Sequence, residues 1–385
     1  MARILWLNWS GGGNLPPSLG IAAELERRSH RVTFAGRPEM VPRVSRAGFR
    51  AIELRRAYEQ AGAYPNRWMP RAASFLTSPA VAEEIRALLD AEGPDLVMVD
   101  QMFPVALLEA ARFGRPSIAV CHTAVRKMLP TWRAFFRTLA EMRAEAGFAP
   151  IPSDLESLWM AQTLMIATTP AALDDTPCDL GHADRLHHVG PSLAIEPHAA
   201  PISLPWDNED VPLVLVSFST MPEQGSVSKF QATIDALAGL PVHAVVTVGD
   251  SIDPAALRPA ANVLVLATAD HGTLMQQSRL VVTHGGHGTL MRALAQGLPL
   301  VVVPGMAADQ SVNAAAVEAW GVGKALPRDA AAEMIKQAVT DVLAKPGYSA
   351  RAREVSQHVA GVDGAARAAD IVDQLLAGTL AHHTG

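Results

Sequence analysis

The stretch LVVTHGGHGTLMRALAQ, residues 280–296, decides the fold that the sequence predicts. Residues 280–283 form a continuous apolar run typical of a buried strand, and residues 290–296 have the composition of a helix. Between them lies the glycine-rich turn HGGHGT, residues 284–289. The first N–H groups of a helix have no partner within the helix and lie at its positive end, so a turn of this kind favours anions. We therefore predict a strand–turn–helix unit of a parallel α/β sheet, with an anion site at the turn.

The turn departs from two common phosphate-binding motifs. No Lys follows the glycines, so it is not a Walker A loop, and it lacks the Gly-x-Gly-x-x-Gly spacing of a dinucleotide fingerprint. A glycine-rich turn with incidental histidines stays open as an interpretation. The two histidines also suit a metal, but no third ligand lies nearby in the sequence, and we expect no metal site.

The same alternation of a short apolar run, a turn and a segment of helical spacing recurs along the chain. Short, continuous apolar runs suit strands that helices bury on both faces, as in parallel sheets. We therefore predict an α/β protein with two doubly wound, Rossmann-like domains. Besides residues 280–283, the predicted strands lie at residues 4–7, 32–34, 96–99, 117–120, 213–218, 244–248, 263–266 and 300–303.

A proline-rich segment divides the chain. Residues 190–211 hold Pro191, Pro197, Pro201 and Pro205 and show no periodicity, which is typical of an interdomain connector. A chain of 385 residues also fits two domains better than one core. We predict one domain over residues 1–200 and another over residues 201–385, with a ligand cleft between them and the last helix free to pack back on the first domain.

Charge and composition exclude several classes of partner. The net charge is -6 and no block of Lys or Arg is present, which argues against nucleic acid and against an anionic membrane surface. No apolar run reaches the roughly 18–20 residues that span a bilayer. Cys121 and Cys178 cannot form a disulfide framework, so we expect a cytoplasmic protein without membrane insertion. The expected partners are small molecules, with the chain a monomer or a homodimer.

Polar residues follow the next predicted strand. Asp309 and Gln310 come just past residues 300–303, at the carboxyl end of a strand, where a cleft is expected. A carboxylate accepts hydrogen bonds and an amide both donates and accepts them, which is what recognition of sugar hydroxyls requires. The alternative is that Asp309 only caps a helix.

These motifs together resemble a known family. His-Gly-Gly-x-Gly-Thr from His284 onward, Gly-x-Pro, Pro, Asp-Gln and Asn-Ala, in this order, are similar to the C-terminal signature of the family 1 glycosyltransferases. These include plant UDP-glycosyltransferases and bacterial macrolide and antibiotic glycosyltransferases. Residues 17–19 and 30–33 match the N-terminal pattern of the family, and residues 216–220 match the first strand and loop of its donor domain. The resemblance therefore spans essentially the whole chain.

The resemblance implies a GT-B fold, in which an N-terminal acceptor domain and a C-terminal donor domain face each other across a cleft. It also implies an inverting, metal-independent reaction that uses a nucleotide-diphosphate sugar as co-substrate and no cofactor. The turn would hold the diphosphate, a second loop would lie against the nucleotide, two residues would pack the base, and two would bind the transferred sugar. The donor-site residues implied in this way are Ser219, Thr220, Ala269, His271, His284, Gly285, Gly286, Gly288, Thr289, Arg292, Asp309 and Gln310.

The predicted acceptor domain departs from the family at its general base. The family has a His in the first strand-to-helix loop, where this chain has Asn14, and an amide cannot accept a proton near neutral pH. Asp100, which matches the carboxylate that supports that His, could act as the base itself if burial raises its pKa. His122, after the next predicted strand, is a third candidate. Structural roles stay open for all three: a turn at Asn14, a cap or structural hydrogen bond at Asp100, and a structural histidine at His122.

A second departure lies on the helix that follows the turn. The family has Glu where this chain has Arg292, and that Glu accepts hydrogen bonds from the ribose, which an arginine cannot do. Arg292 comes three residues after Thr289 and shares its helix face. It therefore either reaches the diphosphate or turns to solvent or to a carboxylate such as Glu318.

Two segments of the first predicted domain are rich in large apolar side chains, which suit a flat, lipophilic ligand. The resemblance implies that such segments line the acceptor pocket, and a place in the core is the alternative for any one of these residues. The predicted acceptor contacts are Trp68, Met102, Phe103, Trp132 and Phe136.

The sequence thus predicts an enzyme that transfers a hexose from a UDP- or dTDP-sugar to a small lipophilic natural-product acceptor, such as a polyketide-derived aglycone. Two other hypotheses stay open. One is a non-catalytic or helper protein of the same fold that binds nucleotide or aglycone, and the other is a sugar-nucleotide epimerase. Transfer to carbon or nitrogen in place of oxygen is open as well.

Overall fold

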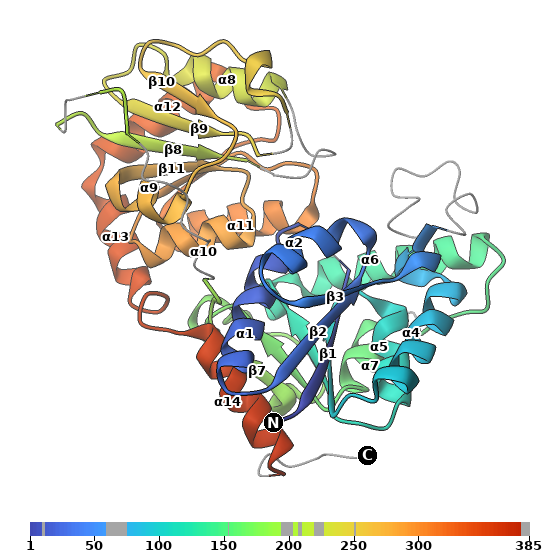
Figure 1. Cartoon of the computed structure of the whole chain (residues 1–385). Coiled ribbons are helices and arrows are strands. Elements are labelled where there is room, and N and C mark those ends of the chain that lie inside the picture. Colours follow the sequence, from blue (N-terminus) through green and yellow to red (C-terminus); the bar gives the residue numbers. More distant parts are fainter. Residues whose placement is uncertain are drawn as a thin grey trace. The chain divides into compact units, whose positions relative to one another are not determined.

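The computed structural model describes residues 1–9, 12–58, 75–152, 154–193, 203–206, 210–218, 227–249 and 252–378 (Figure 1). It divides into two compact units, one comprising Met1–Ala194 with Asp363–Gly385 and the other Ile195–Val362. The division falls inside the predicted connector, slightly before the predicted boundary at 200/201. The second domain was predicted to run to residue 385 with its last helix free to pack back on the first domain, and the chain returns to the first unit from Asp363 onward. No helix among the described residues is long and apolar enough to pass through a lipid bilayer.

The described strands of the first unit form one seven-stranded parallel sheet in the order β3-β2-β1-β4-β5-β6-β7. Successive side chains of a strand point to opposite faces of the sheet, so strands that are buried throughout need cover on both faces. β4 and β5 are buried at every residue. The strands are β1 (Arg3–Asn8), β2 (Arg31–Gly36), β3 (Arg50–Glu53), β4 (Leu96–Asp100), β5 (Ser117–Cys121), β6 (Leu164–Ala167) and β7 (Leu186–His188).

Helices provide this cover on both faces of the sheet (Figure 1). Ile4 and Trp6 of β1 lie in one core cluster with apolar residues of the first and last helices of the unit, while the alternate residues Leu5 and Leu7 are equally buried. The helices are α1 (Leu15–Arg27), α2 (Val41–Arg46), α4 (Pro79–Glu92), α5 (Pro104–Arg112), α6 (Val125–Glu145), α7 (Leu155–Met160) and α14 (Gly364–Leu376).

The described strands of the second unit form a six-stranded parallel sheet in the order β10-β9-β8-β11-β12-β13. They are β8 (Leu213–Ser217), β9 (His243–Thr247), β10 (Val263–Leu266), β11 (Ser278–Thr283), β12 (Leu300–Val302) and β13 (Gly323–Ala325). The helices are α8 (Val227–Leu237), α9 (His271–Gln277), α10 (His287–Ala295), α11 (Ala308–Ala319), α12 (Ala332–Ala344) and α13 (Pro346–Ser356). The prediction of two Rossmann-like parallel sheets is confirmed.

Each sheet has one place where the direction of strand addition reverses, between β1 and β4 in the first unit and between β8 and β11 in the second. We call these the first and the second switch point. The loops that leave the two strands at such a point run in opposite directions and open a crevice, where open α/β sheets bind their ligands. Of the predicted catalytic residues, Asn14 follows β1, Asp100 ends β4 and His122 follows β5, and the predicted diphosphate turn follows β11.

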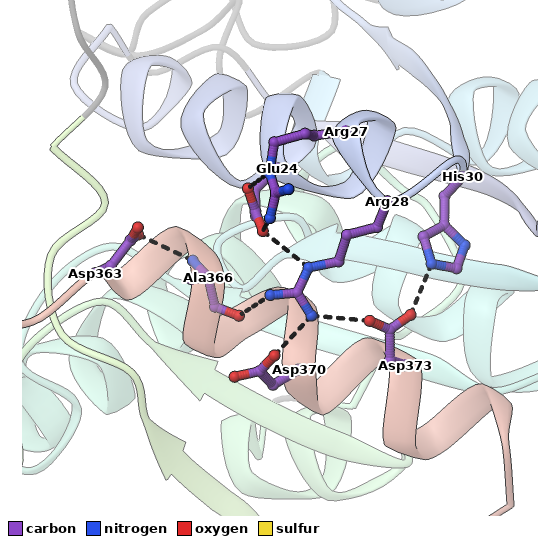
Figure 2. Close-up of polar contacts among 8 residues, drawn as sticks. All are labelled: Glu24, Arg27, Arg28, His30, Asp363, Ala366, Asp370 and Asp373. Carbon is purple, nitrogen blue, oxygen red and sulfur yellow. Dashed lines mark hydrogen bonds and ion pairs between the residues drawn. The ribbon is translucent and has the colours of Figure 1, made fainter.

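The last helix packs on the first helix of the same unit, although the second unit lies between them in sequence. Arg28 Nη1, just after α1, donates to Asp370 Oδ1 at 2.6 Å and to Asp373 Oδ2 at 2.8 Å on α14, and Asp373 Oδ1 lies 2.8 Å from His30 Nε2 (Figure 2). These ionic contacts flank an apolar seam. The residues of α14 in the core cluster that it shares with α1 are Ala368, Ala369, Val372 and Leu375.

Candidate functional site

The second switch point is built around the glycine-rich turn. β11 ends at Thr283 and α10 begins at His287, so His284, Gly285 and Gly286 make the turn between them. Gly286 is the N-cap residue of α10 and contributes no capping side chain. An anion at this helix end would therefore not compete with a capping side chain of that residue for the first N–H groups.

The path of this turn requires glycine. Gly285 has a φ of +86°, and a Cβ atom there would lie 2.9 Å from both the carbonyl oxygen of Gln310 and Val302 Cγ1. A Cβ atom on Gly286 would lie 2.6 Å from His284 Nε2. The glycines thus let three segments of the second unit approach one another closely at the switch point.

His284 supplies a neutral imidazole at this turn. Burial lowers the pKa of His284 to about 4, although its interaction with the backbone of Ser217 opposes that change. Ser217 ends β8, so this interaction joins the two strands that flank the second switch point. His284 Nδ1 is buried and has no hydrogen-bond partner among the described residues. A neutral imidazole carries one N–H, so His284 donates to an anionic ligand when that proton is on the nitrogen that faces the ligand, and it carries no positive charge to it.

The start of α11 contacts the same turn. Asn313 Nδ2 donates to the carbonyl oxygen of Gly285 at 2.7 Å. Gln310 is buried, and its Oε1 accepts from the backbone N of Gly305 at 2.6 Å. Asp309 is not the N-cap of α11, and burial raises the pKa of its carboxyl to about 6. The two residues predicted to bind the sugar therefore lie next to the turn, with the amide oxygen of Gln310 holding a neighbouring loop.

The other predicted donor residues lie at the carboxyl ends of the outer strands and on α10. His271 begins α9, and its Nε2 lies 2.9 Å from Thr247 Oγ1 at the end of β9. Ala269 lies two residues before it and is partly buried. Gly288 and Thr289 occupy the first turn of α10, where Gly288 is exposed and a Cβ atom on it would meet no atom within 4 Å.

Arg292 lies near a carboxylate other than the one predicted. Its charge helps to lower the pKa of Asp270, the N-cap residue of α9, after the larger contribution of the Thr273 hydroxyl. Glu318, the carboxylate named from the sequence, instead accepts from the backbone N of Ala325 at 3.2 Å. Asp270, rather than Glu318, is therefore the carboxylate on which the charge of Arg292 acts.

At the first switch point, Asn14 and Asp100 are joined directly. Asn14 Nδ2 donates to Asp100 Oδ2 at 2.7 Å, and the backbone N of Met102 donates to Asp100 Oδ1 at 2.9 Å. Burial raises the pKa of Asp100 to about 7, against the lowering effect of these two hydrogen bonds. Asn14 has ordinary right-handed backbone angles and makes no side-chain cap, so its amide serves Asp100 and not the turn or the helix end.

His122 joins the same network through Ser18 on α1. The hydroxyl Oγ of Ser18 donates to the carbonyl oxygen of Asn14 at 2.9 Å and lies 3.0 Å from His122 Nε2. Asn8 Nδ2, at the end of β1, donates to Ser18 Oγ at 3.1 Å. The three predicted catalytic residues are thus brought together, and Asn8 and Ser18 are members that sequence reasoning did not single out. The position of Ser18 in the family's N-terminal pattern, residues 17–19, was the available signal.

The predicted acceptor residues divide by burial. Met102, beside Asp100, is partly exposed. Phe103 is fully buried and its ring centroid lies 4.5 Å from that of Phe75, so it packs in the core. Trp132 and Phe136 on α6 are 6% and 2% exposed, so Trp132 shows the larger, though small, accessible surface. Met102 is therefore the predicted acceptor residue best placed to meet a ligand near Asp100.

Three predicted site residues, Ser219, Thr220 and Trp68, lie outside the described residues. Within the described part of the chain, no group of three or more His, Cys, Asp or Glu side chains is arranged to hold a metal ion. The site residues that the structure does describe at the two switch points are mainly hydrogen-bonding and ionisable groups.

Comparisons with known proteins relate the chain to glycosyltransferases. Residues 231–377 match the model of the erythromycin biosynthesis protein CIII-like C-terminal domain, and residues 19–151 match that of glycosyltransferase family 4. The NDP-glycosyltransferase YjiC of Bacillus licheniformis is 26% identical, over 97% of this chain and 98% of that protein. The oleandomycin glycosyltransferase of Streptomyces antibioticus is also 26% identical, over 97% of this chain and 90% of that protein.

Solved structures agree with this relation. The calicheamicin glycosyltransferase CalG4 superposes with a TM-score of 0.78 at 26% identity, covering 99% of both chains. The spinosyn rhamnosyltransferase SpnG, solved with thymidine diphosphate, superposes with a TM-score of 0.76 at 20% identity, over 97% of this chain and 99% of that one, which is a likeness of fold. The resemblance to bacterial natural-product glycosyltransferases and the GT-B fold are confirmed.

Proposed function

We propose that this chain, which has the GT-B fold, is a glycosyltransferase that transfers a sugar from a UDP- or dTDP-sugar to a hydroxyl of a small lipophilic natural product, with inversion and without a divalent metal. The observation that carries this proposal is the Asn14–Asp100 hydrogen bond of 2.7 Å at the first switch point. This hydrogen bond holds an ionisable carboxyl group in place at the first switch point, and the proposed reaction needs such a group as its base. Relatives named for oleandomycin and structures named for calicheamicin support the choice of acceptor class.

In this proposal the nucleotide-sugar donor binds at the second switch point. The N-terminal N–H groups of α10 and the neutral His284 would hydrogen-bond the diphosphate, and the partial positive charge of the helix end would favour it. A solved structure of similar fold with thymidine diphosphate is consistent with a dTDP- or UDP-linked donor. The start of α11, with Asp309 and Gln310, would meet the sugar because it contacts the same turn.

The first switch point would activate the acceptor. The ionised Asp100 carboxylate would take the proton of the acceptor hydroxyl as the acceptor oxygen bonds to the anomeric carbon. The bond from that carbon to the diphosphate oxygen breaks, and the diphosphate leaves with the electron pair. Attack opposite to the leaving group inverts the anomeric centre. Asn14 would orient Asp100 and stabilise its ionised form, because its amide donates to the carboxylate.

Fixed hydrogen-bond donors of the protein would stabilise the negative charge of the leaving diphosphate. Hydrogen-bond donors that are already in place lower the free energy of a developing anion without reorganisation, typically by about 3–4 kcal/mol for each donor. We therefore propose that transfer needs no divalent metal and no cofactor. Activity that persists at full rate in the presence of a chelator would agree with this, and loss of activity that Mg²⁺ restores would contradict it.

The test of the proposed function is product formation. The full chain is incubated with a panel of UDP- and dTDP-sugars and lipophilic polyketide-type acceptors, and products are identified by mass spectrometry, with NMR to assign the anomeric configuration and the linked atom. We expect an acceptor whose mass increases by one sugar residue, with inverted configuration and an oxygen linkage. Binding of nucleotide without any transferred sugar would favour a helper protein, and conversion of the sugar nucleotide without acceptor would favour an epimerase.

A further inference from the structure

The hydroxyl of Ser18 joins three segments around the first switch point. Ser18 lies on α1 and is fully buried. Its Oγ accepts from Asn8 Nδ2, at the end of β1, at 3.1 Å and donates to the carbonyl oxygen of Asn14 at 2.9 Å. The same Oγ lies 3.0 Å from Nε2 of His122, which follows β5. Because β4 lies between β1 and β5 in the sheet, Ser18 contacts segments on both sides of the strand that ends at Asp100.

The proton of this hydroxyl has one position that satisfies all three contacts. A hydroxyl donates one hydrogen bond and accepts two. The carbonyl oxygen of Asn14 can only accept, and two oxygens at 2.9 Å would repel each other without a hydrogen between them, so the Ser18 proton lies there. His122 Nε2 must then carry a proton and donate to Ser18 Oγ. The three contacts together use the full hydrogen-bonding capacity of the hydroxyl.

Ser18 is bonded to the residue that orients Asp100. Ser18 follows Asn14 by four positions, so the two residues lie on the same face of α1, one turn apart. Asn14 is the N-cap residue of α1 but makes no side-chain cap, because its amide donates to Asp100 Oδ2 at 2.7 Å. The ends of helices fray easily. The bond from the Ser18 hydroxyl to the Asn14 carbonyl therefore holds in place the backbone that carries this amide.

We infer that Ser18 is a positioning residue for the proposed base. Its hydroxyl, which accepts from Asn8 and His122, keeps Asn14 where the amide orients Asp100. The inference rests on the function proposed above, in which Asp100 takes the proton of the acceptor. His122 is a fixed donor in this network and not the base, and both Ser18 and His122 act through Asn14.

The first experiment is a double-mutant cycle of Ser18→Ala and Asn14→Ala. For each variant, kcat, KM for the donor and the pH of half-maximal activity are measured for sugar transfer. Ser18→Ala should lower kcat about tenfold, the factor that corresponds to the loss of one hydrogen bond, with KM for the donor unchanged. It should also raise the pH of half-maximal activity, because a misplaced amide lowers the pKa of Asp100 less. In the Asn14→Ala background the same change should have little further effect, since both residues act through one contact.

The second experiment tests the proton assignment at His122. His122→Gln keeps an N–H donor for Ser18 but cannot ionise, whereas His122→Leu removes the donor. We expect His122→Gln to keep most of the wild-type kcat and the wild-type pH of half-maximal activity, and His122→Leu to resemble Ser18→Ala. The thiol of the neighbouring Cys121 does not titrate in the pH range measured, because burial raises its pKa to about 12.

Ser278→Ala is the matched control. Ser278 is also buried, and its Oγ donates to the carbonyl oxygen of Leu274, again four positions earlier, at 2.7 Å in the second unit. This variant should keep the wild-type kcat and pH profile. Ser18→Thr keeps the hydroxyl and should restore most of the activity. Should Ser18→Ala fail to fold, Ser18→Cys replaces it, and the unfolding temperature of each variant is recorded.

Each outcome decides the inference. If the wild-type protein transfers no sugar, the proposed function is wrong, and so is the role given to Ser18. If Asp100→Asn abolishes transfer but Ser18→Ala keeps the wild-type kcat and pH profile, the proposed function stands and the inference is wrong. Equal losses from Ser18→Ala in the wild-type and Asn14→Ala backgrounds would show a role independent of Asn14, which also overturns the inference. Loss of the pH dependence in His122→Gln would make His122 the titrating group and overturn both.

Discussion

Burial shifts a pKa at both switch points, but the side chain is an acid at the first and a base at the second. At the first, burial raises the pKa of Asp100 to about 7, and at the second, burial lowers the pKa of His284 to about 4. Both shifts favour the neutral form, yet the consequences differ at neutral pH. Asp100 stands at the midpoint of its titration and can exchange a proton, whereas His284 stays neutral and can only exchange hydrogen bonds. The first switch point is therefore suited to proton transfer and the second to anion recognition.

The largest expected effect removes the ionisable group of the first switch point. Asp100→Asn should lower the rate of sugar transfer by about 10²–10⁴-fold, because the amide cannot take the acceptor proton. Initial rates at saturating donor and acceptor measure this. The affinity for UDP or dTDP should stay at the wild-type value, since those contacts belong to the other unit. A variant with wild-type turnover would remove Asp100 from the mechanism.

The corresponding change at the second switch point removes the neutral imidazole. His284→Ala should lower turnover by about 10²-fold or more, because one fixed donor to the departing diphosphate is lost. The exposed His358 offers a control, and His358→Ala should behave as wild type. Undiminished turnover in His284→Ala would contradict the diphosphate assignment.

A third prediction concerns the backbone that shapes the second switch point. Gly285→Ala should reduce the free energy of unfolding by about 1–3 kcal/mol, because the added methyl group meets a positive φ and two atoms at 2.9 Å. Gly288→Ala is the matched control in the same turn, since its Cβ would meet no atom within 4 Å. Urea denaturation of both variants makes the comparison. Equal stabilities would mean that the turn relaxes and that its glycines are not required.

The smallest expected effect tunes the first switch point without removing its base. Asn14→Ala deletes the hydrogen bond that lowers the pKa of Asp100, so that pKa should rise further. The pH at which activity is half-maximal should move up by about one unit, given the strength of a hydrogen bond to a charged group. The pH dependence of kcat/KM for both proteins measures the displacement. A displacement to lower pH would contradict the role given to Asn14.

The sequence predicted the sheets better than it predicted the contacts between distant segments. Short apolar runs such as residues 280–283 favour strands covered on both faces, because alternate side chains of a strand point to opposite faces of the sheet. The docking of α14 depends on Arg28 meeting Asp370 and Asp373, which lie 342 and 345 positions away, and no local pattern encodes that pairing.

The same limit applies to the candidate site. Asn14 and Asp100 were found through the family resemblance, and their direct hydrogen bond spans 86 positions. The role of Ser18 was not found, since its partner His122 lies 104 positions away, after another strand. Arg292 was noted as unusual, but Asp270 became its neighbour only through the packing of α9 and α10. Sequence motifs thus revealed groups of residues that are adjacent in the chain. The contacts between residues far apart in the chain became known only from the order of the strands in the structure.

The most direct test of the account is the pH dependence of kcat/KM for sugar transfer, measured from about pH 5 to about pH 9 in wild-type protein and in Asp100→Asn. Because Asp100 must be ionised to accept a proton, wild-type activity should rise with pH, reach half its maximum near the pKa of about 7, and then level off. The residual activity of Asp100→Asn should lack this rise. A wild-type profile that is flat across this range, or the same rise retained in Asp100→Asn, would contradict the central claim that the first switch point performs the proton transfer.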